Sequence, residues 1–99
     1  MGAYELHFHK DAFAEWKKLD TGMRERLKKK LARRLQNPFV ESALLSGELA
    51  GLYVIRSKAD GLRLVYEVNL ELKTLTVASV GKREDLEAYR NAVTRIKGL

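Results

Sequence analysis

The sequence predicts an α+β domain, with an antiparallel sheet that carries helices, in the order β-α-α-β-β-β-α. Three observations lead to this prediction. Apolar and polar residues alternate in four short segments, which is the period of a half-buried strand. In three other segments, apolar residues recur every three or four positions, which is the period of an amphipathic helix. An Asp60-Gly61 pair lies between two alternating segments, and such a pair is a strong signal for a hairpin turn between antiparallel strands.

The composition is that of one globular domain, expected to span residues 1–99. The chain is 45% hydrophobic and 32% charged and contains one Pro, which is unlike a disordered segment. It has no apolar run of membrane-spanning length and no charged-then-apolar leader pattern, so the expected compartment is the cytoplasm. The absence of Cys excludes disulfides and thiolate metal sites. A net charge of +6 favours an anionic partner, either nucleic acid or an acidic protein.

The first half of the chain reads as a strand followed by two helices. Alternation over residues 4–8 predicts a strand. Asp11 is expected to cap a helix with an apolar stripe, interrupted at residues 20–22. Leucines at every fourth position after Met23 predict a second helix, which Asn37-Pro38 ends.

The second half reads as three strands and a helix. Strands are expected at about residues 52–58, 62–69 and 73–80, the last ending at Gly81, with a helix over residues 84–97. A two-residue loop at Asp60-Gly61 pairs Arg56 with Val65 and Lys58 with Arg63. The helices should cover the apolar face of this sheet. The other face, expected to be partly open, then carries three cations: Arg56, Lys58 and Arg63.

Cations fill most of the second helix outside its leucine stripe. Two interpretations remain open for them: an ordinary solvated face, or a surface that follows phosphates without reading sequence. The residues concerned are Arg24, Arg26, Lys28, Lys29, Lys30, Arg33 and Arg34.

Two further cations, Lys82 and Arg83, precede the start of the last helix. Positive charge there opposes the helix dipole, whereas a bound phosphate would be favoured by it. These residues could complete a basic pocket with the cations of the open sheet face. Tyr89 on the last helix fits this pocket or the core equally well. His7 and His9 share one strand face, but no third ligand converges with them in the sequence.

The sequence resembles the RelE-type toxins of bacterial and archaeal toxin-antitoxin pairs. The likeness covers about residues 3–97 and includes five segments in order: AEWKKL (14–19), RERLKKKL (24–31), GLRLVYEV (61–68), SVGKRE (79–84) and AYRNAVTRI (88–96). The resemblance implies the same β-α-α-β-β-β-α fold. It also implies an mRNA endonuclease that acts in the ribosomal A site, where the 2′-OH of the mRNA attacks the adjacent phosphate. It implies no metal or cofactor.

Carried over by position, the resemblance implies catalytic roles for Arg56, Arg63, Arg83 and Tyr89. The family's best-known members have a further Lys at the position of Val54, so a proton acceptor is missing there, and Lys58 and Lys82 are the candidates to replace it. RNA and ribosome contacts are expected from Arg24, Lys28, Lys29, Lys30 and Arg33. The implied partners are a RelB-like antitoxin and the ribosome, with operator DNA contacted only through the antitoxin and no membrane.

Two other functions are compatible with the sequence. A non-catalytic RNA-binding module would explain the basic residues, because helix-sheet domains also bind duplex RNA by its shape. A degenerate toxin that only binds its antitoxin and helps repress the operon would explain Val54.

Overall fold

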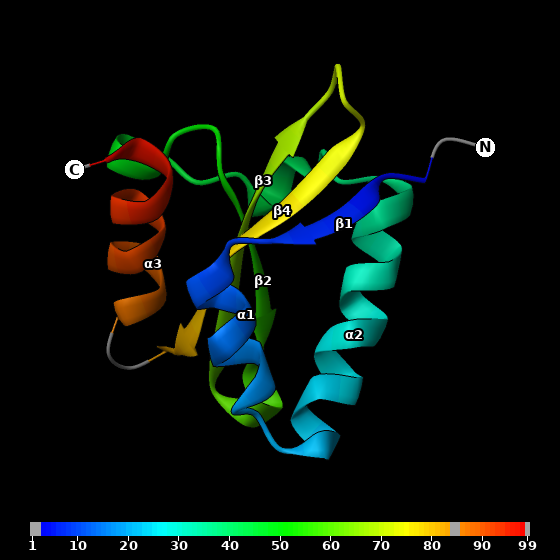
Figure 1. Ribbon diagram of the computed structural model, residues 1–99, viewed down its shortest axis with the longest axis vertical. Coiled ribbons are helices and arrows are strands. Elements are labelled where there is room, and N and C mark those ends of the chain that lie inside the picture. Colours follow the sequence, from blue (N-terminus) through cyan, green and yellow to red (C-terminus); the bar gives the residue numbers. More distant parts are fainter. Residues whose placement is uncertain (1–2, 84–85, 99) are drawn as a thin grey trace.

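The computed structural model describes residues 3–83 and 86–98. It contains one four-stranded sheet in the order β1-β4-β3-β2 (Figure 1). The strands are β1 (Glu5–Phe8), β2 (Tyr53–Ser57), β3 (Leu62–Asn69) and β4 (Thr74–Lys82). The α+β class and the order of elements are confirmed. The prediction of a wholly antiparallel sheet is wrong at one edge, because β1 pairs with β4 in parallel.

The helices are α1 (Lys10–Lys17), α2 (Thr21–Gln36) and α3 (Glu87–Ala92), which continues as a π-helical segment (Val93–Lys97). Residues 84 and 85, predicted to begin the last helix, lie outside the described residues. The cap of α1 is His9 and not Asp11, because His9 Nδ1 accepts a hydrogen bond from the Asp11 amide at 3.2 Å. Asp20 caps α2 by accepting from the Met23 amide at 2.9 Å. Within the described ranges, no helix has both the length and the apolar character needed to cross a membrane.

The sheet is covered on both faces. Ala12 of α1 and Leu27 of α2 join Leu64 and other buried residues in one core on the first face. On the second face, Ala88 and Ala92 of α3 pack on Val65 and Ala78 in a separate core. The prediction that the helices share one apolar face therefore holds only for α1 and α2.

The hairpin between β2 and β3 has a longer loop than predicted. Ser57 pairs with Leu62, so four residues (58–61) form the loop, and Arg56 pairs with Arg63 rather than Val65. Gly61 closes this loop in the left-handed conformation with φ +63°, which a residue without a Cβ adopts at little cost. The predicted register is thus wrong by two positions. A shift of two preserves the side-chain alternation, so the predicted faces of the strand residues are confirmed, whereas Lys58, predicted on the open face, lies in the loop.

The helix α3 is tied to α1 through a partly buried ion pair. Pairing of β1 with β4 ends at Val77, and further along β4 the Val80 amide donates to the Glu15 carboxylate at 3.0 Å. The same carboxylate accepts two hydrogen bonds from Arg95 of the π-helical segment, at 2.9 and 3.0 Å. The hydrogen bond to Glu15 raises the pKa of the Arg95 guanidinium. Glu15 therefore holds the C-terminal half of the last helix against the sheet.

The helix α2 is held on β2 in a similar way. Arg34 donates to the carbonyl oxygen of Val54 at 3.1 Å and to the Tyr66 hydroxyl at 3.0 Å. That hydroxyl donates to the carbonyl of Pro38 at 2.8 Å, and burial raises the pKa of Tyr66. These bonds fix the second half of α2 beside the edge strand that carries Arg56.

Candidate active site

A row of three residues crosses neighbouring strands at one end of the sheet. Arg56 on β2 pairs with Arg63 on β3, which pairs on its other side with Gly81 on β4. Directly paired residues share a face, so the two side chains leave the sheet on the face that α3 covers. Like charges in this position destabilise a sheet. Such a pair is retained more readily where an anion binds between the charges.

The Arg63 side chain has the most unusual environment of the described residues. Its guanidinium carbon lies 4.7 Å from the centre of the Tyr89 ring, a distance typical of cation–π contact. Its Nε and Nη1 atoms are buried and have no hydrogen-bond partner within residues 3–83 and 86–98. An unpaired buried donor costs about 1–3 kcal/mol. The two donors therefore lie beside an aromatic ring without an acceptor among the described residues.

Gly81 brings α3 close enough for this contact. A Cβ at Gly81 would lie 3.1 Å from the Ala88 amide nitrogen and 3.3 Å from its Cβ, closer than side chains ordinarily pack. Without that atom the start of α3 approaches β4 directly. Tyr89 then reaches Arg63, the residue paired with Gly81. The sequence predicted Gly81 only as the end of a strand, whereas the strand continues to Lys82.

Arg83 is joined to the same end of the sheet through its main chain. It lies one residue beyond β4, and its amide donates to the Gly61 carbonyl at 2.8 Å. The side chains of Arg83 and Arg56 are exposed. The structure thus places three predicted catalytic residues and the Arg83 main chain where β2, β3, β4 and α3 meet.

The two auxiliary lysines line different hollows. Lys58 lies in the hairpin loop and lines a hollow of about 440 Å³ together with Arg56 and the α2 residues Arg26, Lys29, Lys30 and Arg33. Lys82 pairs with Leu62 and so lies on the opposite face from Arg63. There it lines a different hollow with Lys18.

The seven cations of α2 divide into two groups. Three of them bond to other parts of the chain: Arg24 to the carbonyls of Lys17 and Leu19, Arg26 to Asp60, and Arg34 to Tyr66 and Val54. The other four, Lys28, Lys29, Lys30 and Arg33, are exposed. These four are therefore the α2 cations that remain as candidates for a phosphate-following surface.

Val54 is closed to solvent. Its side chain is 1% exposed and pairs with Val65 inside the sheet. Position 54 therefore offers no proton acceptor, because its side chain is aliphatic and buried.

The two histidines have hydrogen-bond partners of their own. His7 contacts Glu5 at 2.7 Å, and His9 caps α1. In the part of the chain that the structure describes, no three His, Asp or Glu residues are grouped as metal ligands.

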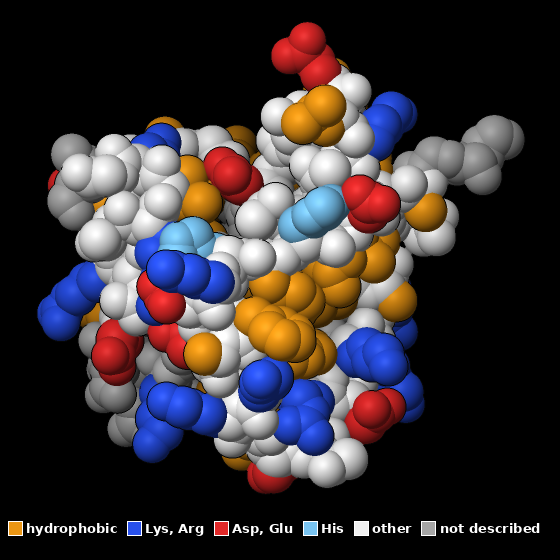
Figure 2. Space-filling view, in the orientation of Figure 1, with side chains coloured by type: hydrophobic (Ala, Val, Ile, Leu, Met, Phe, Trp, Pro, Cys, Tyr) orange, Lys and Arg blue, Asp and Glu red, His pale blue; other side chains and the backbone are white. Residues whose placement is uncertain are grey.

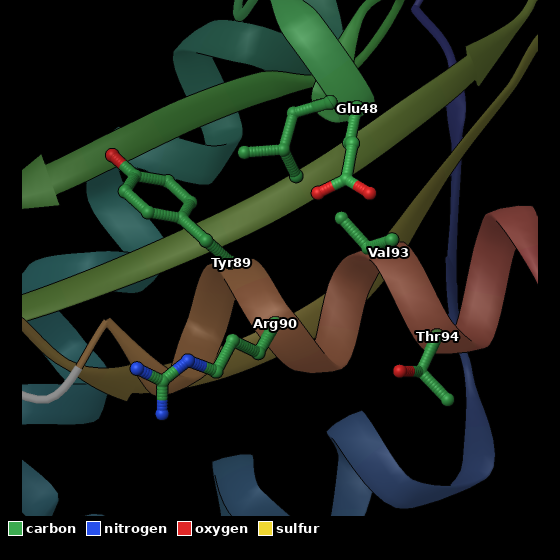
Figure 3. Close-up of a pocket in the computed structure, with 6 residues that line it drawn as sticks. Glu48, Tyr89, Arg90, Val93 and Thr94 are labelled. Carbon is green, nitrogen blue, oxygen red and sulfur yellow. The ribbon is translucent and has the colours of Figure 1, made fainter. Parts of the chain in front are cut away.

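Tyr89 also borders a second hollow, of about 380 Å³, between α3 and the 3₁₀ segment Gly47–Leu49. Figure 3 shows Tyr89 and Val93 on the side of α3 that faces Glu48, whereas Arg90 and Thr94 point away from it. The hollow adjoins the Arg63 site through the tyrosine ring.

An apolar groove of about 280 Å³ lies away from this site, between β1, α1 and α2. Hydrophobic side chains gather in the centre of this face, with Lys and Arg side chains mainly below and to the right of them and a His and acidic side chains above (Figure 2). The apolar residues that line it are Leu6, Phe8, Trp16, Leu31, Ala32 and Leu35. Trp16 is therefore only partly a core residue.

Comparison with known proteins identifies the family. Residues 6–87 match the family model of the ParE toxin of type II toxin-antitoxin systems. The chain is 46% identical over 94 residues to the mRNA interferase toxin RelE of Escherichia coli K12, covering 95% of this chain and 98% of that protein. The crystal structure of the intact E. coli RelBE toxin-antitoxin complex contains a chain that matches with a TM-score of 0.77 and 44% identity, covering 81% of this chain and 96% of the other.

A second solved structure agrees more closely in shape. An arginine-to-alanine double mutant of E. coli toxin RelE in the free state matches with a TM-score of 0.86 and 45% identity, covering 95% of this chain and 98% of the other. Sequence identity at this level over nearly the whole chain, together with the shared fold, goes well beyond a likeness of fold alone. The chain therefore belongs to the RelE/ParE family of toxins of type II toxin-antitoxin systems.

Proposed function

We propose that this chain is a metal-independent mRNA interferase that cleaves mRNA in the ribosomal A site and so stops translation. The observation that carries the proposal is the Arg63 guanidinium, whose Nε and Nη1 are buried without a described partner beside Tyr89. A scissile phosphate would supply the acceptors that this group lacks. The identity to E. coli RelE, which is named an mRNA interferase toxin, supports the same activity.

In the proposed reaction the 2′-OH of the mRNA attacks the adjacent phosphorus. The new O–P bond displaces the 5′-oxygen of the next nucleotide, which leaves a 2′,3′-cyclic phosphate and a 5′-OH end. One proton leaves the attacking hydroxyl and one is delivered to the leaving oxygen. Arg56 and Arg63 hold the phosphate oxygens, for which a guanidinium is suited because it donates in pairs and stays charged. Arg83 stabilises the charge that develops on the phosphorane.

Proton transfer falls to Tyr89 and a lysine. Tyr89 lies against Arg63, where its hydroxyl can orient the attacking ribose or exchange a proton with it. Lys58 lines the same hollow as Arg56, whereas Lys82 lies on the opposite face from Arg63. Of the two lysines, Lys58 is thus the better placed to take the role of the residue missing at Val54.

The exposed α2 cations (Lys28, Lys29, Lys30 and Arg33) dock the chain on ribosomal RNA by following phosphates. The chain works in the cytoplasm, where its substrate is, and is held inactive by a RelB-like antitoxin. Solved complexes of E. coli RelE with its antitoxin RelB support this partner. Operator DNA is contacted only through the antitoxin.

Analysis of the RNA ends after cleavage on programmed ribosomes tests the proposal. We expect cuts within the A-site codon, with 2′,3′-cyclic phosphate and 5′-OH ends, and no cutting of the same RNA without ribosomes. Binding to ribosomes without cleavage would support the non-catalytic RNA-binding module. Antitoxin binding without ribosome binding or cleavage would support the degenerate toxin.

A further inference from the structure

The Asp60 carboxylate joins the hairpin loop to α2. Arg26 donates to it from Nε at 2.9 Å and from Nη2 at 2.6 Å, and the Ser57 hydroxyl donates at 2.7 Å. The Asp60 side chain is 6% exposed. A two-point arginine–carboxylate contact fixes orientation as well as distance. The loop is therefore held at a set position relative to the helix.

Gly61, the residue after Asp60, connects the fixed loop to Arg83. Gly61 adopts the left-handed conformation with φ +63°, and its carbonyl accepts the Arg83 amide at 2.8 Å. The β3–β4 ladder ends at the pair Leu62–Lys82. The bond to Gly61 is thus the main-chain contact that holds Arg83 just beyond the ladder.

We propose that Asp60 and Arg26 are positioning residues for Arg83. Arg26 fixes Asp60, Asp60 fixes the loop, and the Gly61 carbonyl fixes the main chain from which the Arg83 side chain extends. This inference rests on the proposed function, since Arg83 is placed there as the group that stabilises the phosphorane. It also gives Arg26 a purpose other than RNA binding.

The reason for such a tie is the steep dependence of catalysis on geometry. A displacement of about 1 Å in a group that contacts the transition state can lower a rate by about 10²-fold. Side chains on loops are held less well than those on helices or strands, unless other contacts lock them. Arg83 lies outside β4, so the Asp60 contact supplies the missing rigidity.

Asp60→Asn separates positioning from RNA binding, because the two roles predict opposite results. The variant keeps the size of the side chain but replaces one acceptor with a donor that opposes Arg26. If the residue acts by positioning, single-turnover cleavage on ribosomes should fall by about 10-fold, with ribosome affinity unchanged. If the local charge matters only for binding RNA, removing a negative charge should tighten binding and leave the rate intact. That second result would overturn the inference.

A double-mutant cycle tests whether the effect passes through Arg83. In an Arg83→Ala background, Asp60→Asn should lower the cleavage rate no further, because the group that it positions is gone. Additive losses would contradict the inference. The cleavage rate of Arg26→Lys, which keeps the charge but not the two-point contact, should lie between the rates of the parent and of Asp60→Asn. Arg34→Met is the matched control, since it breaks another tie between α2 and the sheet and should lower Tm without changing the cleavage rate.

Hydrogen exchange tests the same tie without any cleavage assay. Asp60→Asn should speed exchange of the Arg83 amide, which bonds to Gly61. The His9 amide, which bonds to the Val77 carbonyl at 2.9 Å at the other edge of β4, should be unaffected. Unchanged protection at Arg83 would reject the positioning role even if the chain cleaves mRNA. If the parent chain cuts no mRNA but Asp60→Asn still speeds exchange of the Arg83 amide, the proposed function is rejected. The structural link from Asp60 to Arg83 is then retained.

Discussion

At the scale of single residues, the site holds a side chain that the fold alone would not favour. Arg63 buries two donors without described partners, and the contact with Tyr89 offsets only part of that cost. A cation–π contact is worth about 0.5–2 kcal/mol, while each unpaired donor costs about 1–3 kcal/mol. The residue therefore costs stability in the described fold, as expected of a group whose partner is a bound anion under the proposed function.

Arg63→Met should make the chain more stable and inactive. The thioether fills similar space without unpaired donors, so we expect the free energy of unfolding to rise by about 1 kcal/mol while cleavage is lost. Urea denaturation and ribosomal cleavage measured on the same preparation check both parts. A less stable variant would mean that Arg63 is a structural residue.

Arg83→Ala should separate catalysis from binding. In the proposed mechanism Arg83 contacts the charge that grows in the transition state, so its loss should lower single-turnover cleavage by about 10² or more and change A-site affinity much less. Filter binding with an uncleavable 2′-deoxy mRNA gives the affinity. Equal losses in rate and affinity would assign Arg83 to substrate binding instead.

At the scale of elements, the cations of α2 fall into two groups with different surroundings. Its arginines at 24, 26 and 34 bond to other parts of the chain. Its cations at 28, 29, 30 and 33 are exposed. One helix thus connects α1, the hairpin loop and β2 on its inner side and presents a basic surface on its outer side.

Reversing the charge of Lys28, Lys29 and Lys30 to Glu should weaken ribosome binding and flatten its dependence on salt. Each phosphate contact contributes a release of bound counterions, so fewer contacts give a smaller slope of log affinity against log salt. The same triple reversal at Lys10, Lys17 and Lys18 on and after α1 is the control for net charge. An equal effect from both triples would indicate non-specific attraction and restore the solvated-face interpretation of α2.

At the scale of the whole molecule, long-range contacts decide what the sequence could and could not predict. The strand and helix periods predicted every main element. The alternation of side chains along the hairpin predicted which residues of β2 and β3 lie on each face of the sheet. The four-residue loop was missed because Asp60-Gly61 is a strong local signal for a two-residue turn, while the partner of Asp60 is Arg26, 34 residues away. Nothing local marks that pairing.

Other misses have the same cause. The parallel pairing of β1 with β4 joins the two ends of the chain, and alternation does not specify a partner. Gly81 in β4 gave a signal, because a glycine inside a strand often marks the close approach of another segment. Arg56, Arg63 and Tyr89 were predicted through the family resemblance. Their meeting depends on Gly81 and on the placement of α3 on the second face.

The tie at Asp60 should appear in the pH dependence of folding. Hydrogen bonds from Arg26 and Ser57 lower the pKa of Asp60 to about 2, from an ordinary value of 3.8. A carboxyl with a lowered pKa stabilises the fold above its ordinary pKa, and this contribution is lost as the pH falls through the folded value. Asp60→Asn should thus be less stable than the parent at about pH 6, with a smaller difference at about pH 3. A constant difference in urea midpoints would contradict the lowered pKa.

Co-expression with the neighbouring small open reading frame should abolish toxicity and yield a stable complex. The net charge of +6 and the apolar groove with basic side chains along one side of it (Figure 2) suit an acidic, amphipathic segment that folds as it binds. This chain expressed alone should arrest growth. Harmless expression of the folded chain would favour the degenerate toxin, and a gain of cleavage in Val54→Lys would then identify the missing group.

The parallel pairing of β1 with β4 also bears on the order in which the site assembles. Glu5–Phe8 pairs with residues 74–77, and folding that depends on such distant pairing is slow. Until β4 joins the sheet, the first strand has no neighbour and the row of Arg56, Arg63 and Gly81 is incomplete. We therefore expect this row and Tyr89 to come together only in a late step of folding, after the hairpin of β2 and β3 has formed.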